Sequence, residues 1–170
     1  LSARLILAYS LLFLTLLTSS HEISIDGRLD DASWKQATEY TKYYESLPFT
    51  LDEPKDFQKV LILEDEKGIY LGFVNEQAKD TVRANKHERD DEMANTDKAG
   101  LAIDFDGDGL AAYSFTVSAS GSISDGIYRN ENEVNYDWDA DWKSAVFIDE
   151  NFWYIEMFIP WTIAPMKSVD

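Results

Sequence analysis

The sequence contains no cysteine, so neither disulfide bonds nor thiolate metal sites are available to this chain. Basic residues are also scarce, with 15 Lys and Arg against 32 Asp and Glu, which gives a formal net charge of −17. A surface of this sign repels nucleic acid and anionic lipid, so we expect no nucleic-acid partner. Histidine occurs only as His21 and His87, which do not form a metal-binding His pair.

Catalytic motifs are lacking as well. Neither a Gly-x-Ser-x-Gly nucleophile elbow nor a phosphate-binding glycine loop occurs. A glycosidase needs only two carboxylates in a cleft, but among 32 acidic residues such a pair is not diagnostic. We therefore predict that the chain is not an enzyme. A haem-binding sandwich would use His87 and Met93 as axial ligands, but both stand in a polar stretch, so no haem is expected.

Long apolar runs are absent except at the start of the sequence. Arg4 precedes an apolar stretch from Leu5 to Leu17, and small residues follow, which is the pattern of a signal peptide over residues 1–20. A membrane anchor is the alternative, but the run is shorter than the roughly 20 residues that a spanning helix needs. We expect secretion across the inner membrane and a periplasmic or outer-membrane location.

Aromatic residues, in contrast, are abundant, with five Trp, nine Tyr and nine Phe. This composition predicts a folded domain with an acidic exterior rather than a disordered acidic tail. The roughly 150 residues after the leader suffice for one domain, which we place at 21–165 and expect to be monomeric.

Short stretches of alternating apolar and polar residues recur along the chain and predict β-strands. A brief helix is expected after Asp30, with Trp34 on its apolar side, and no long amphipathic helix follows. This pattern predicts an all-β fold, an antiparallel β-sandwich with one short N-terminal helix. Polar, acidic loops are expected at Lys79–Gly100 and Arg129–Asp141. The predicted strands are 22–25, 41–45, 57–64, 69–75, 101–106, 111–118, 122–128, 142–149 and 152–159.

The stretch AIDFDGDGLAAYSF, residues 102–115, contains the start of an EF-hand calcium loop. Counted from Asp104, however, the twelfth position is Phe115, which cannot bind calcium. The residues on both sides alternate as in strands, and Gly107 and Gly109 supply the positive φ angles that a hairpin requires. We therefore predict a β-hairpin.

The sequence DWDADW at residues 137–142 holds the densest group of carboxylates. On an extended segment Asp137, Asp139 and Asp141 share one face, and crowded carboxylates favour a bound cation such as calcium. The alternative is a solvated loop whose tryptophans, Trp138 and Trp142, close the end of the sandwich.

Six blocks along the chain belong together by their order and spacing: IDGRLDDASW (25–34), VLILEDEKGIYLGF (60–73), RDD (89–91), AYSFTVSASG (112–121), DWDADW (137–142) and FWYIEMFIPW (152–161). Together they resemble a family 9 carbohydrate-binding module, in the subgroup found at the front of larger bacterial proteins. The resemblance implies an immunoglobulin-like (DOMON-like) sandwich that binds a polysaccharide or oligosaccharide. It also implies that residues 166–170 begin a linker to a C-terminal, outer-membrane barrel-like domain of the same chain.

Sugar-binding members of that family clamp a sugar ring between two tryptophans, while acidic and amide side chains bond its hydroxyls. Here residues 94–96 are Ala-Asn-Thr where one clamping Trp is expected, and Thr116 and Ser118 replace longer polar side chains. The candidate carbohydrate-binding residues that the resemblance implies are Trp138, Trp142, Arg89, Asp97 and Asp125. An ion pair between Arg89 and an acid, which would brace the loops, is the alternative role for the polar members.

The resemblance predicts a non-catalytic carbohydrate-binding module of a secreted or outer-membrane protein, with a place in carbohydrate catabolism. The missing clamp residues favour an alternative, in which the sandwich has lost sugar binding and is a structural or assembly module that supports the downstream barrel.

Overall fold

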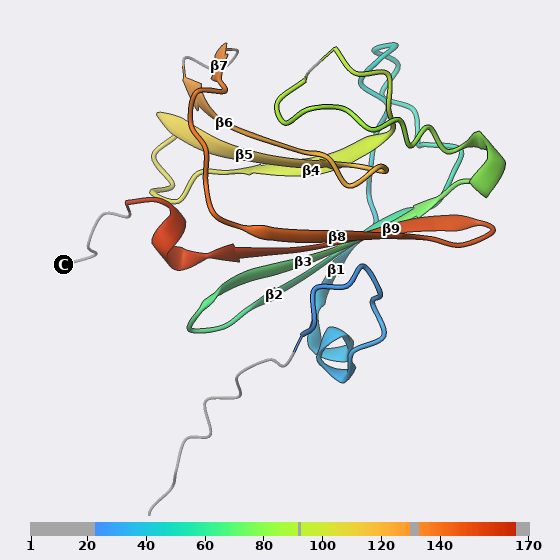
Figure 1. Cartoon of the computed structure of the whole chain (residues 1–170), viewed down its shortest axis with the longest axis horizontal. Helices are drawn as coiled ribbons and strands as arrows, with labels where there is room; N and C mark the ends of the chain where they lie inside the picture. Colours follow the sequence, from blue (N-terminus) through green and yellow to red (C-terminus); the bar gives the residue numbers. More distant parts are fainter. Residues whose placement is uncertain (1–22, 92, 130–132, 166–170) are drawn as a thin grey trace, which may run out of the picture.

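The computed structural model describes residues 23–91, 93–129 and 133–165. These residues form two antiparallel sheets that stack as the two layers of a sandwich (Figure 1). The predicted all-β antiparallel β-sandwich is therefore confirmed. The predicted signal peptide at 1–20 and the linker at 166–170 lie outside the described residues.

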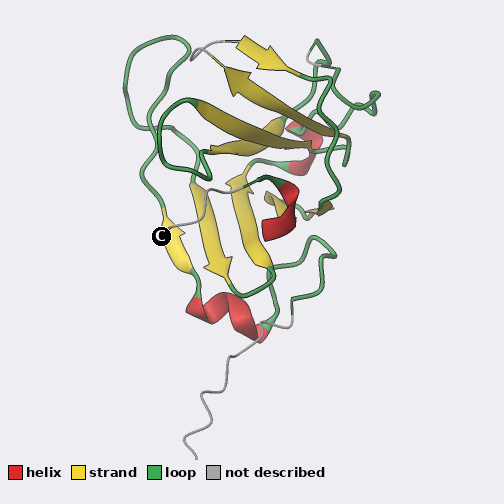
Figure 2. Cartoon of the chain, turned by 90° about the vertical axis from the view of Figure 1, so that its left-hand side faces the viewer, coloured by secondary structure: helices red, strands yellow, loops and turns green. Residues whose placement is uncertain are grey.

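The first layer, sheet A, has five strands in the order β1-β2-β3-β9-β8, and the second, sheet B, has four in the order β4-β5-β6-β7. Figure 2 shows the two layers from the side. The strands are β1 Thr38–Tyr40, β2 Gln58–Glu64, β3 Gly68–Glu76, β4 Lys98–Ile103, β5 Ala111–Ser118, β6 Ile123–Arg129, β7 Glu133–Asn135, β8 Lys143–Ile148 and β9 Phe152–Pro160.

The helices of the described residues are short 3-10 turns of five, three and three residues. None of them has the length or the apolar character to cross a bilayer. They are η1 Ala32–Gln36, η2 Lys79–Thr81 and η3 Trp161–Ile163. The first corresponds to the predicted N-terminal helix, although the carboxylate of Asp31 at its start accepts a bond from Ser24 N rather than capping the turn.

The main core lies between the sheets and follows from the period-2 alternation of the strands. Ile155, Met157 and Ile159 of β9 face Phe115 and Val117 of β5, and all five side chains have 0% exposure. The intervening residues of β9 point to the opposite face of sheet A, where Glu156 is buried and Tyr154 and Phe158 are half-buried. Strand β9 is therefore covered on both faces.

A second, smaller core covers the outer face of sheet A, where the N-terminal segment and η1 pack (Figure 1). Trp34, which is 5% exposed, packs there with Leu61, Leu63 and Tyr70. Trp34 thus lies on the apolar side of η1, as predicted, and that side faces sheet A.

A buried carboxylate, that of Glu156 on β9, fixes the N-terminal segment to this face. Its Oε2 accepts bonds from the backbone N–H groups of Asp26 (2.9 Å) and Gly27 (2.8 Å), and its Oε1 accepts from Trp34 Nε1 (3.0 Å). Burial raises the pKa of Glu156, and the three donors oppose that shift. Gly27 has φ +88°, and a Cβ there would lie 2.7 Å from the Val146 carbonyl carbon, so the contact requires glycine.

The DFDGDG stretch forms the predicted hairpin turn between β4 and β5. The carboxylate of Asp104 accepts hydrogen bonds from the N–H groups of Asp106 (3.1 Å), Gly107 (2.9 Å) and Gly109 (2.7 Å). Gly107 and Gly109 have φ of 65° and 72°. Asp104 therefore organises the turn by bonding its own backbone, as aspartates commonly do in turns.

Three strand predictions were wrong. The first pairing strand of sheet A is Thr38–Tyr40, whereas the predicted strand at 41–45 lies in the loop that follows it. Residues 23–25 pack on sheet A without forming a strand, and Glu22 lies outside the described residues. The three-residue β7 falls inside the predicted loop Arg129–Asp141.

Candidate functional site

A groove of about 660 Å³ runs between edge strand β4 of sheet B and the inner faces of β2 and β3 in sheet A. Its floor consists of directly opposite residues on β2 and β3, which project to the same face. The floor is polar at one end and apolar along the rest. From the polar end onward, the pairs are Gln58 and Asn75, Val60 and Phe73, and Ile62 and Leu71.

Three further segments complete the groove. Residues 98–101 of β4 supply part of the lining, and Tyr40, Tyr43 and Asp56 supply another part from β1 and the loop 41–57. Near Asn75, the lining includes Gln77, Asp97 and Trp153. The groove thus combines aliphatic, aromatic and hydrogen-bonding side chains, which is the usual composition of a small-molecule site.

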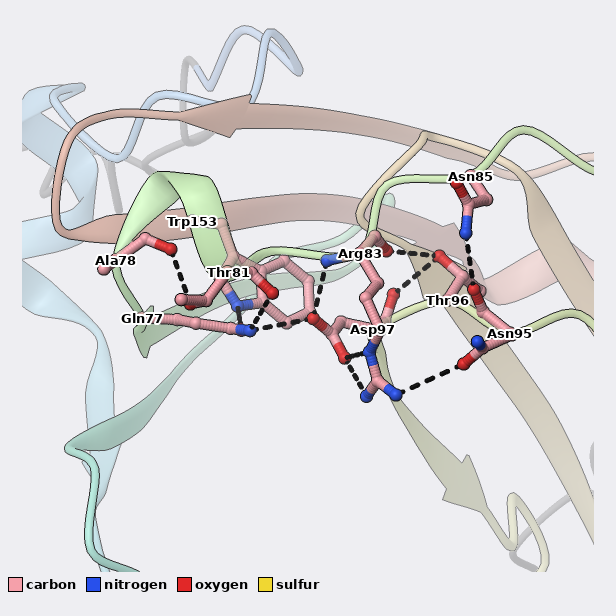
Figure 3. A network of polar contacts seen from close by, with 9 residues as sticks. All are labelled: Gln77, Ala78, Thr81, Arg83, Asn85, Asn95, Thr96, Asp97 and Trp153. Atoms are coloured by element: carbon pink, nitrogen blue, oxygen red, sulfur yellow. Dashed lines mark hydrogen bonds and ion pairs between the residues drawn. The ribbon is translucent and has the colours of Figure 1, made fainter.

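The polar end of the groove is braced by Asp97, whose side chain is 12% exposed. Figure 3 shows its carboxylate between the Gln77 amide and the Arg83 guanidinium. It accepts bonds from Gln77 Nε2 (2.9 Å), from Arg83 N (2.9 Å) and from Arg83 Nε (2.9 Å), and it also pairs with Arg83 Nη2. Burial alone would raise the pKa of Asp97, but these bonds together hold it below its usual range.

Because a carboxylate has about four acceptor sites, the Asp97 oxygens are already fully engaged by the protein. Gln77 extends the network, since its Oε1 accepts a bond from Trp153 Nε1 (3.1 Å) at the edge of the core. Asp97 therefore lies in the groove, as a carbohydrate-binding residue should, but its own bonds make it a brace.

Other polar groups of the groove are available to a ligand. The side chains of Tyr43, Asp56 and Gln58 make no hydrogen bond with any other described residue. Burial raises the pKa of the Tyr43 hydroxyl, which keeps it protonated and able to donate as well as accept. A donor-acceptor hydroxyl, a carboxylate and an amide thus converge beside an apolar floor.

A second polar cluster surrounds Arg89. Its guanidinium pairs with Asp125, which is 0% exposed, and lies 2.8 Å from Asp139 and 3.5 Å from Asp90. Asp125 also accepts a bond from Ala140 N (2.8 Å), and Asp90 accepts one from Asp125 N (2.9 Å). Burial raises the pKa of Asp90. The predicted pairing of Arg89 with an acid is confirmed, and none of these residues lines the groove.

The ligand atoms of Asp90, Asp125 and Asp139 lie within 4.8 Å of one another, so this cluster could hold a metal ion. Of the three ligands predicted from DWDADW, only Asp139 belongs to it. Asp137, Asp139 and Asp141 are all exposed and alternate with more buried neighbours, as expected, but they do not form the cluster. Arg89 already supplies positive charge to all three carboxylates of the observed cluster.

The tryptophans of DWDADW close the end of the sandwich. Trp142 is 7% exposed and packs edge-on against Phe115 with ring centroids 5.5 Å apart. Trp138 is partly buried, 5.0 Å from the Tyr113 ring, and lines a hollow of about 290 Å³ together with Asp139 and Asp141. A sugar could not stack on Trp142 without displacing the core, so Trp138 is the accessible ring of the two candidate tryptophans.

Sequence reasoning missed Tyr43, Gln58 and Asn75 of the groove and Arg83, the partner of Asp97. One indication was available, because Gln58 stands on the same face of its strand as the apolar Val60 and Ile62. A polar residue on the same strand face as core residues indicates that this face meets a polar environment at one end.

No protein-family model matches the chain, and no curated protein matches it. Among solved structures, the chain is similar to a "putative carbohydrate-binding protein" from Bacteroides uniformis, with a TM-score of 0.56 and 15% sequence identity. The match covers 75% of this chain and 62% of that protein's length. At this identity the likeness shows the fold, and the resemblance to family 9 stays a prediction.

Proposed function

We propose that this protein is a non-catalytic carbohydrate-binding module and that its ligand lies in the groove along β2, β3 and β4. The observation that carries the proposal is the floor of the groove, where an apolar surface continues into the polar pair Gln58 and Asn75. The similarity to a "putative carbohydrate-binding protein" supports the same ligand class.

Each part of the groove has a role in this proposal. The apolar floor and the ring of Tyr43 would contact the C–H faces of a sugar. Asp56, Gln58 and the Tyr43 hydroxyl would bond its hydroxyl groups, and bonds to a carboxylate are the stronger ones. The Asp97 network holds the polar end in place before the ligand arrives, which reduces the entropic cost of binding.

The proposal is tested by screening the protein against a glycan array and titrating the strongest ligand by calorimetry. Gln58→Ala should weaken binding about tenfold, the value of one hydrogen bond of about 1.4 kcal/mol. Gln36→Ala, on the far side of sheet A, is the matched control and should bind like the wild type. The absence of any glycan ligand, or equal binding by Gln58→Ala, would contradict the proposal.

A structural or assembly module is the second candidate, and the loop between β1 and β2 favours it. Leu47 and Phe49 at the tip of this loop are 92% and 78% exposed, and exposed apolar groups of this kind mark docking sites. A well-folded protein that binds no glycan on the array would favour this candidate over the first.

We also propose that the protein is exported to the periplasm or the outer membrane. The apolar stretch of residues 5–17 supports this location. N-terminal sequencing of the mature protein checks the proposal, and an intact leader in cytoplasmic material would contradict it.

A further inference from the structure

We infer that the site takes an extended, neutral glycan chain of several sugar units, rather than a single sugar or an acidic polymer. This inference rests on the proposed function of the groove. Its starting point is a second hollow of about 310 Å³ that runs along the loop 41–57. The two hollows share Tyr43, Asp56, Gln58 and Glu76, so they form one continuous path.

The second hollow has the chemistry of a sugar-binding surface. The rings of Tyr44 and Phe57 line it and are 61% and 46% exposed, so their faces are open to a ligand. Lys42, Glu53 and Lys55 line it as well. An apolar peptide or lipid would leave these charged groups without partners, whereas a polyhydroxylated chain can bond them while it stacks on the rings.

The loop that carries these rings is held in place at two points. Across the loop, Glu45 N donates to Asp52 O (2.8 Å) and Leu51 N donates to Glu45 O (3.1 Å). At its end, Glu76 N donates to Phe57 O (2.8 Å), and Phe57 N donates to the Glu76 carboxylate (3.0 Å). The rings are therefore positioned beside the groove before binding, so little ordering entropy is lost there.

The volume of the two hollows and the charge of the protein indicate which glycans fit the site. The groove alone falls within the range of about 300 to 1,000 Å³ that holds a whole small ligand, so the second hollow adds room for further units. Four lysines line the two hollows against four acidic residues, so the lining offers an acidic polymer no net attraction; they are Lys42, Lys55, Lys59 and Lys98 against Glu53, Asp56, Glu76 and Asp97. The net charge of −17 on the whole chain then disfavours uronic acids relative to neutral sugars.

The test compares the dimer and the hexamer of four neutral series, namely cello-, xylo-, manno- and malto-oligosaccharides, with hexagalacturonate as the acidic probe. At least one neutral hexamer should bind ten or more times tighter than its dimer. Tyr44→Ala should remove that gain and leave dimer affinity unchanged. Phe49→Ala, an exposed ring of the same loop that lines neither hollow, is the control and should bind like the wild type.

The outcomes separate this inference from the proposed function. Equal affinity for a dimer and its hexamer, or a gain that survives Tyr44→Ala, overturns the extended-chain inference while the groove remains a sugar site. Binding of hexagalacturonate alone overturns neutral selectivity and leaves the proposed function standing. If none of these probes binds and the glycan array is also blank, both fail together.

Discussion

At the scale of single residues, Arg89 supplies the counter-charge for the cluster of Asp90, Asp125 and Asp139. Asp125 is fully buried and pairs directly with the guanidinium, while Asp90 and Asp139 lie around the same group. A buried charge that loses its partner is strongly destabilising. The cluster therefore depends on one positive charge, which Arg89 supplies in this structure.

Arg89→Ala should lower the free energy of unfolding by about 3 kcal/mol, because Asp125 would remain buried without a counter-charge. Arg129→Ala, which removes an exposed arginine of β6, should change stability by less than about 0.5 kcal/mol. Denaturant unfolding at pH 7 measures both.

Calcium provides the second arm of that experiment. Millimolar calcium should restore part of the stability of Arg89→Ala and leave the wild type unchanged, since the wild-type carboxylates are already paired. A wild type that melts several degrees higher in calcium than in chelator would show that the ion displaces the guanidinium.

At the scale of elements, alternation predicted the strands that carry the core and failed for those that do not. Residues 111–118 were predicted with the bounds of β5, because Tyr113, Phe115 and Val117 alternate toward the core. The exposed three-residue strands β1 and β7 have no such pattern, since pairing alone defines them. Tyr43 and Tyr44 are of a residue type that favours strands, so the sequence pattern predicted a strand at 41–45, which is a loop in the structure.

The N-terminal segment shows how one element is attached to another. Its docking on sheet A combines the apolar contacts of Trp34 with the indole bond to Glu156. These two contributions can be separated by substitution, because phenylalanine keeps much of the apolar volume and lacks the N–H donor.

Trp34→Ala should cost about 3 to 5 kcal/mol, the range for deleting a buried aromatic side chain. Trp34→Phe should cost about 1 to 3 kcal/mol, because it leaves a Glu156 oxygen without its donor. Thermal unfolding followed by circular dichroism measures both variants. A Trp34→Ala variant as stable as the wild type would contradict the assignment of Trp34 as a buried core residue.

At the scale of the whole molecule, the candidate site is assembled from segments that are distant in the sequence. The groove joins the loop 41–57, β2, β3, β4 and Trp153 of β9, and Asp97 meets Arg83 across a loop. The family resemblance predicted that Asp97 and Arg89 bind a sugar or brace the loops. Their ion-pair partners could not be predicted. The sequence holds 32 acidic and 15 basic residues, and only the fold determines which of them come into contact.

The abundance of acids makes the stability of the whole molecule sensitive to acidic pH, and Asp97 contributes with a definite sign. Its native pKa lies below the ordinary value of 3.8, while the unfolded chain keeps the ordinary value. As the pH falls, the unfolded state therefore takes up the proton first. The stability that Asp97 provides is complete above about pH 5 and is lost as the pH falls through the lowered native pKa.

Asp97→Asn should therefore lower the free energy of unfolding by about 2 kcal/mol at pH 7, because it loses charge-assisted bonds to Arg83. The gap to the wild type should narrow steadily as the pH falls toward 3, because protonation gives the wild type the same loss. Urea unfolding between pH 3 and 7 measures it. Asp137→Asn removes a carboxylate from an exposed site and leaves the Asp97 network intact, so it should follow the wild-type curve. A gap that stays constant across this range would mean that Asp97 acts through packing and not through its charge.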